Sequence, residues 1–106
     1  MNRILYNKIV RDKIPDIIAV AGKKAIIEVV GTDEVIVGLE DKLSEELKEY
    51  LADHKLEELA DILEVIRGIL YHRGTTWDDL ETIRLLKYDK NGGFEKGIRL
   101  LEVEEP

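Results

Sequence analysis

Two long amphipathic segments follow each other with almost no chain between them, and this feature constrains the fold more than any other. Over about 32–52, and again over about 55–71, apolar residues recur at spacings of three and four. That period is typical of α-helices with one buried face. Only Asp53 and His54 separate the two expected helices. Since so short a connection leaves no room for a crossover, the sequence predicts an antiparallel helical hairpin.

Shorter elements are expected on both sides of this hairpin. A helical pattern over about 14–21 begins beside a proline and ends at a glycine, and another helix is expected from Trp77 to about residue 88. Residues 25–30 are rich in β-branched side chains, which favours a short strand. A second strand, over about 97–103, could pair with it. The expected fold is mainly α with a small β element.

Length and composition exclude several classes of protein. A chain of 106 residues is expected to form a single domain over 1–106. Sixteen basic residues against twenty-three acidic ones, with a net charge of -7, argue against a nucleic-acid-binding module. The chain has no cysteine, so disulfides and thiolate metal sites are excluded. No apolar run approaches the ~20 residues of a membrane span, and no secretory signal is evident. We therefore expect a cytoplasmic protein that does not bind membranes.

The acidic residues of the hairpin carry the chemical information. With about 100° of rotation per residue, Glu46 and Glu49 lie together on one margin of the apolar stripe of the first helix. On the second helix Glu58 falls inside the apolar arc and Asp61 lies at its border. A carboxylate among aliphatic side chains is costly unless it is paired or bound to a cation. Four convergent carboxylates would suit a hard cation such as Mg²⁺.

A second interpretation of the same residues needs no metal. Acidic pairs three residues apart are common on solvated helix faces, where nearby lysines form ordinary surface ion pairs with them. Lys42, Lys48 and Lys55 are placed to do so. The spacing alone leaves both interpretations open.

Three motifs in order resemble one enzyme family. The acids of residues 45–49 and 57–64 are similar to the EExxE…ExxD signature of the all-α nucleotide pyrophosphohydrolases, the MazG-like superfamily. Residues 6–15, YNKIVRDKIP, resemble the opening of its phosphoribosyl-ATP pyrophosphohydrolase-like subgroup, and residues 91–96, NGGFEK, resemble the closing motif of that subgroup. The resemblance covers nearly the whole chain.

The resemblance implies an activity and a site. The reaction would be hydrolysis of a nucleotide between its α- and β-phosphates, giving a monophosphate and pyrophosphate. Acids at the positions of Glu46, Glu49, Glu58 and Asp61 would hold Mg²⁺, with Mn²⁺ as a substitute, and form the catalytic centre. Members of the family assemble as homo-oligomers, so a dimer or tetramer is expected.

A nucleotide also requires local positive charge. Two basic clusters could bind its phosphates: Lys8, Arg11 and Lys13, and Arg84, Lys87 and Lys90. Ordinary solvation is the alternative for each of these side chains. Two rival functions stay open: phosphoribosyl-ATP as the substrate in place of a nucleoside triphosphate, and a non-catalytic helical interaction module.

Overall fold

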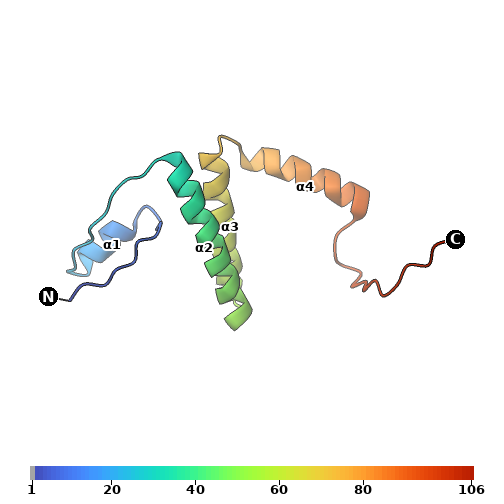
Figure 1. Cartoon of the computed structure of the whole chain (residues 1–106), viewed down its shortest axis with the longest axis horizontal. Coiled ribbons are helices and arrows are strands. Elements are labelled where there is room, and N and C mark those ends of the chain that lie inside the picture. Colours follow the sequence, from blue (N-terminus) through green and yellow to red (C-terminus); the bar gives the residue numbers. More distant parts are fainter. Residues whose placement is uncertain (1) are drawn as a thin grey trace. The chain divides into compact units, whose positions relative to one another are not determined.

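The computed structural model describes residues 2–106, and this part of the chain contains four helices (Figure 1). They are α1 (Ile14–Val20), α2 (Thr32–Asp53), α3 (Leu56–His72) and α4 (Trp77–Asn91). The prediction of a mainly helical protein is confirmed. None of the helices within residues 2–106 combines the length and the apolar character needed to cross a membrane.

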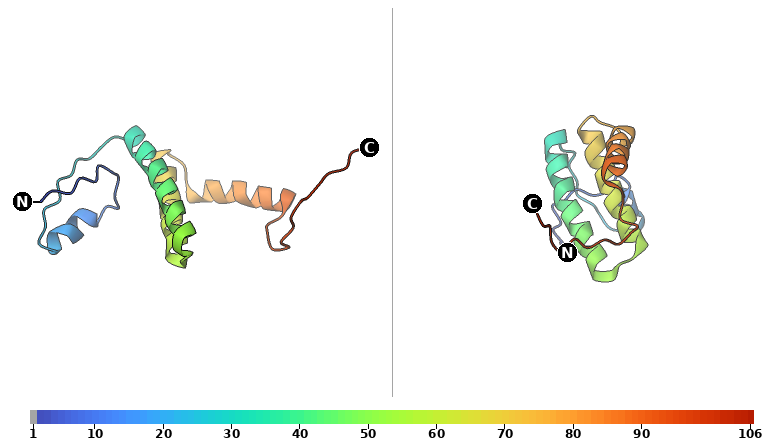
Figure 2. Two further views of the ribbon diagram at one scale, coloured as in Figure 1. Left: turned by 60° about the horizontal axis from the view of Figure 1, so that its bottom comes forward. Right: turned by 90° about the vertical axis from the view of Figure 1, so that its right-hand side faces the viewer.

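Helices α2 and α3 form the expected antiparallel hairpin and lie side by side in both Figure 1 and Figure 2. The turn is formed by His54 and Lys55, one residue later than predicted. His54 adopts the left-handed conformation, with φ of 57°, and thereby ends α2. The carboxylate of Asp53 accepts a hydrogen bond of 3.0 Å from the backbone N–H of Lys55. The turn thus satisfies backbone groups that both helix ends leave free.

The two helices approach closely at a glycine. A Cβ atom built at Gly68 of α3 would lie 3.1 Å from Cδ1 of Leu39 on α2, so the Leu39 side chain would have to shift by a few tenths of an ångström to admit a larger residue. Leu39 and Val65 are the buried hydrophobic residues of the described chain, 8% and 5% exposed. They mark the seam between α2 and α3, which we call the hairpin seam.

The chain divides into two compact units, one ending at Thr75 and the other comprising Thr76–Pro106. In the second unit Thr76 caps α4: its hydroxyl accepts from the backbone N–H of Asp79 at 3.1 Å, and the Asp79 carboxylate accepts from the backbone N–H of Thr76 at 3.2 Å. This reciprocal capping box fixes the start of the helix. A single domain over residues 1–106 stays a prediction.

The predicted β element is the main difference from the sequence analysis. Residues 25–30 and 97–103 form no strand in the described chain. β-Branched residues favour extended backbone, but a strand exists only when its N–H and C=O groups pair with a neighbour. Neither segment has such a neighbour, and Ile26, Val29 and Leu101 are exposed. The local propensity was therefore insufficient evidence for a sheet.

The segment that precedes α1 packs tightly against α2 at Ile9. A Cβ atom at Gly38 would overlap Cγ1 of Ile9, so only glycine lets Ile9 approach the α2 backbone in this way. Ile9 is half-buried, whereas its neighbours in residues 2–8 are exposed. This contact places the basic residues around Ile9 beside the hairpin.

We expect Gly38→Ala to release this segment while leaving the hairpin intact, because the added methyl group takes the place of Ile9. Trypsin should then cleave after Lys8 and Arg11 several times faster than in the wild type. Ile9→Ala in the same background should restore slow cleavage by removing the clash. Equal cleavage rates in wild type and Gly38→Ala would contradict the contact, and circular dichroism would check that the helices persist.

Candidate metal centre

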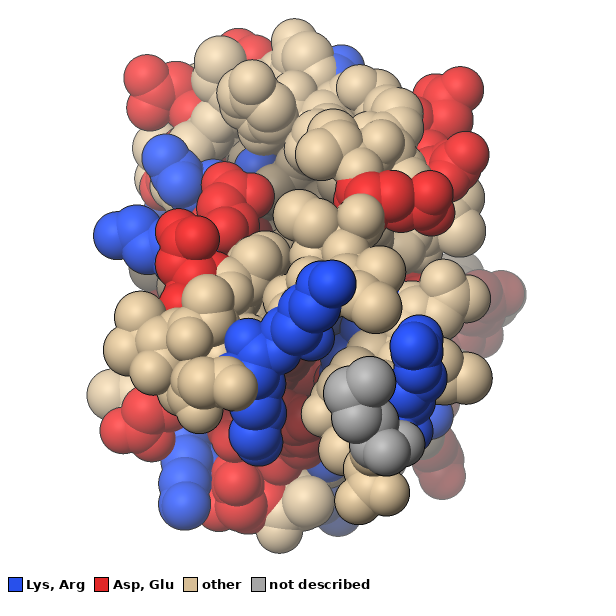
Figure 3. All heavy atoms as spheres, turned by 90° about the vertical axis from the view of Figure 1, so that its left-hand side faces the viewer, with Lys and Arg blue, Asp and Glu red and all other residues tan. Residues whose placement is uncertain are grey.

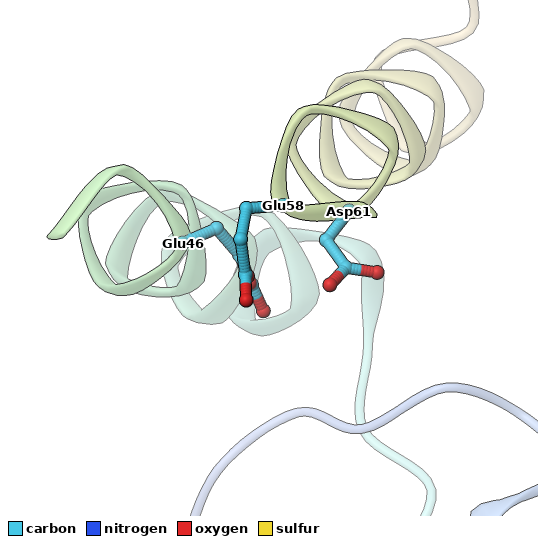
Figure 4. A group of neighbouring side chains, drawn as sticks. All are labelled: Glu46, Glu58 and Asp61. Carbon is cyan, nitrogen blue, oxygen red and sulfur yellow. The ribbon is translucent and has the colours of Figure 1, made fainter. Parts of the chain in front are cut away.

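Three carboxylates from the two hairpin helices converge on one point. Glu46 comes from α2, and Glu58 and Asp61 come from the first turns of α3. Each offers one oxygen atom, and these three atoms all lie within 4.8 Å of one another. Figure 4 shows the three side chains pointing to the same side of the hairpin. The convergence predicted from helical rotation is thus present for these three residues.

The two glutamates are set into the hairpin seam. Glu46 lies two helical turns beyond Leu39, and Glu58 lies two turns before Val65, so both continue the buried face of their helices. Glu46 is only 7% exposed and is the one buried charged residue of the described chain. Its Oε2 atom and the Oε2 atom of Glu58 are buried without a hydrogen-bond partner. Buried polar atoms rarely remain unpartnered, so these two oxygens require an explanation.

The environment favours the protonated form of both glutamates when no cation is bound. Burial raises the pKa of Glu46, and the neighbouring Glu49 carboxyl adds to this effect. For Glu58, burial and the negative charges of Asp53, Glu49 and Asp61 raise the pKa to about 7. Desolvation and mutual repulsion among carboxylates both raise the pKa of a carboxyl group.

Two cationic side chains lie beside these acids. The guanidinium of Arg11 donates a hydrogen bond of 2.7 Å from Nη2 to Oδ1 of Asp61. Nζ of Lys42 lies 3.7 Å from Oε1 of Glu46, one helical turn away on α2. The second interpretation of the acids, as ion-pair partners of lysine, therefore holds for this one contact. The ion pair with Lys42 involves Oε1, however, and leaves the buried Oε2 atom of Glu46 unpartnered.

The remaining predicted site residues are placed differently. Glu49 is exposed and is not one of the carboxylates whose oxygens lie within 4.8 Å of one another. Its carboxyl group nevertheless raises the pKa of both Glu46 and Glu58. Nζ of Lys8 lies 3.1 Å from Oε1 of Glu45, and Lys13 lines a shallow hollow beside α1. These residues belong to the unit that ends at Thr75.

The second predicted basic cluster lies on α4. Arg84 and Lys87 line an open hollow, together with Tyr88 and residues 91–95. Nε of Arg84 donates to Oε2 of Glu81 at 2.9 Å, so its charge is partly neutralised. Lys90 is exposed in the last turn of the helix and does not line this hollow.

The surface charges are interspersed by sign. On the face shown in Figure 3, basic and acidic side chains lie next to each other and leave no continuous basic stripe. A nucleic acid is bound through such a stripe, because neutralised phosphates release their counterions. No such stripe lies on the face shown.

Two residues that shape the site were missed in the sequence analysis. Gly38 and Ile9 bring the Arg11 segment to the hairpin, yet neither is charged or polar. The available signal was a glycine inside a helical pattern, which often marks a close approach by another part of the chain.

The donor set fits a small hard cation. It consists of carboxylate oxygens, and two of those buried atoms lack any other partner. Mg²⁺ and Mn²⁺ take oxygen ligands and keep several waters, so two or three carboxylates suffice. No protein-family model, curated protein or solved structure matches this chain. The assignment of a function therefore depends on the motifs and on this geometry.

The pKa of Glu58 predicts how the metal-free protein responds to pH. Because the folded protein raises this pKa from 4.5 to about 7, the folded state binds the proton more tightly than the unfolded state does. The contribution to stability is complete below pH 4.5 and is lost as the pH rises to about 7. Thermal unfolding with a chelator present should show the melting temperature falling across this range.

Glu58→Gln should flatten this fall, because glutamine does not titrate. Glu57→Gln, at an exposed position in the same helical turn, should leave the fall as it is in the wild type. If the wild type and Glu58→Gln show the same pH dependence, the environment assigned to Glu58 is wrong.

Proposed function

We propose that this protein is a Mg²⁺-dependent nucleotide pyrophosphohydrolase that cleaves a nucleoside triphosphate between the α- and β-phosphates. The observation that carries the proposal is the convergence of Glu46, Glu58 and Asp61 with two buried, unpartnered oxygens. The motif resemblance to the MazG-like superfamily supports the reaction class. It also supports assigning the hairpin to the all-α fold of that superfamily.

The positions of the acidic and basic residues support a role for each of them in this reaction. Glu46, Glu58 and Asp61 hold the divalent cation, and Glu49, at their exposed margin, takes part in orienting the attacking water. When bound, the cation neutralises the charge that develops on phosphate oxygens during phosphoryl transfer. Lys8, Arg11 and Lys13 bind phosphates from the side of the N-terminal segment. Arg84, Lys87 and Lys90 of α4 are also proposed as phosphate-binding residues.

The decisive assay measures pyrophosphate release from a panel of canonical and modified nucleoside triphosphates plus phosphoribosyl-ATP, with and without Mg²⁺. The wild type should release pyrophosphate only with the metal, and Glu58→Gln should lower the rate by at least about 100-fold, since one ligand and its charge are lost. Glu57→Gln is the matched control and should retain the wild-type rate.

The panel also distinguishes the rival functions. Preference for phosphoribosyl-ATP would change the substrate and leave the site assignment standing. Normal Mg²⁺-dependent turnover in Glu58→Gln would refute the site. If no nucleotide yields pyrophosphate and Mg²⁺ does not raise the melting temperature, the non-catalytic interaction module is favoured. A genuine metal site would stabilise the folded state by mass action.

We further propose that the protein functions as a homo-oligomer, a dimer or a tetramer. A hairpin whose buried hydrophobic residues are Leu39 and Val65 alone has too little core for its length. Leucines at helical spacing on α2 and α3 remain exposed: Leu47, Leu51, Leu56, Leu59 and Leu63. A second copy of the hairpin offers the same apolar side chains, so a four-helix bundle would bury both sets.

Leu63→Glu tests this assembly, because it places a charge on the exposed apolar side of α3. Sedimentation velocity should show an oligomer for the wild type and a smaller species for the variant, with a lower melting temperature. Glu57→Lys alters the charge of a polar position on the same helix and should leave the oligomer intact. A monomeric wild type at micromolar concentration would contradict the proposal.

A further inference from the structure

The N-terminal segment places a positive charge against the candidate metal centre. Oδ1 of Asp61 accepts a hydrogen bond of 2.7 Å from the guanidinium of Arg11, fifty positions away in sequence. Ile9, packed on Gly38, fixes the segment two residues before Arg11. The pairing is therefore set by the fold of this unit rather than by neighbouring positions on one helix.

The contact reaches only the outer member of the cluster. Arg11 pairs with Asp61, whereas the buried Oε2 atoms of Glu46 and Glu58 have no partner. The side chains of Arg11 and Asp61 are 53% and 39% exposed. An ion pair at such exposure is weak and exchanges readily. The guanidinium thus neutralises the outer part of the centre without filling it.

A divalent cation and this guanidinium compete for Asp61. A cation held by Glu46, Glu58 and Asp61 would bring two like charges close together at one carboxylate, and their repulsion favours departure of the arginine. Arg11 has a long side chain with free space around it, so it can turn away while Ile9 keeps its backbone in place. The released guanidinium remains within reach of an anion bound to the metal.

We propose that Arg11 is an internal counter-cation of Asp61 that a divalent metal ion displaces, and that the displaced guanidinium then binds the phosphate of the metal-bound nucleotide. The second half rests on the proposed function; the first half requires only that the three carboxylates bind a cation. Arg11 is a phosphate-binding residue here, made available by metal binding. A planar guanidinium suits both partners, since carboxylate and phosphate present similar paired oxygens.

The first half is tested with Mn²⁺ alone, by electron paramagnetic resonance of the metal-free full-length chain. Arg11→Gln should bind Mn²⁺ about threefold to fivefold more tightly than the wild type, because the internal competitor is gone. Arg67→Gln removes an equally charged residue that pairs with Glu64, outside the cluster, and should bind Mn²⁺ like the wild type. Arg11→Lys keeps the charge and should fall between the wild type and Arg11→Gln.

A second measurement follows Arg11 itself in the folded wild type. The side-chain Nε–H signal of Arg11 in a nitrogen–proton spectrum should shift as Mg²⁺ saturates the protein, and the signal of Arg67 should not. Unchanged or weaker Mn²⁺ affinity in a folded Arg11→Gln variant, or a stationary Arg11 signal at saturating Mg²⁺, would overturn the displacement. Absence of Mn²⁺ binding by the wild type would overturn it as well.

The second half is tested with a non-hydrolysable nucleoside triphosphate in the presence of Mn²⁺. Arg11→Gln should weaken its binding about tenfold, although the same variant binds the metal more tightly. Opposite effects on the two ligands are not expected of a purely structural residue. Tighter metal binding with unchanged nucleotide affinity would overturn this half alone.

The outcomes separate this inference from the proposed function. If the wild type hydrolyses nucleotides and Arg11→Gln has normal metal affinity, the inference fails and the function stands. If Arg11→Gln binds Mn²⁺ more tightly but the wild type neither binds nor hydrolyses a nucleotide, the function fails and the displacement stands.

Discussion

The burial of two glutamates at the seam of α2 and α3 is the constraint on which the rest of this site depends. Glu46 and Glu58 lie seven residues from Leu39 and Val65, on the buried faces of their helices, and each leaves an oxygen without a partner. Such burial costs free energy unless a cation compensates it. At Glu46 and Glu58, carboxyl groups therefore take the place of apolar side chains that would pack between the helices.

The hairpin and the outline of the site could be predicted because each depends on local periodicity. Helical spacing and a two-residue connection determined the pairing of the helices, and helical rotation placed Glu58 within an apolar arc. The depth of Glu46 could not be obtained in this way: the sequence placed it on a shoulder, whereas it is 7% exposed. The relative rotation of two helices is set by their mutual packing, here at Gly68 and Leu39.

The contacts that cross between elements were not predictable from one sequence. Nothing in the spacing of Ile9 and Gly38 indicates that they touch, because the contact depends on the path of the whole connecting segment. The expected strands failed for a related reason. Residues 25–30 have the composition of a strand. Strand pairing, however, requires two segments, and the composition of one segment does not show whether a second one pairs with it.

The three carboxylates come from both helices of the hairpin. Glu58 lies in the first turn of α3, where the positive end of the helix dipole favours its charge, whereas Glu46 lies about two turns before the end of α2, too far from that end for the dipole to act on it. A ligand that adds positive charge at this point would relieve the repulsion among the acids. Because its donors come from both helices, the same ligand would also fix their separation. We expect metal binding at these donors to stabilise the closed hairpin, and the proposed displacement of Arg11 from the exposed Arg11–Asp61 pair would not require the seam to unfold.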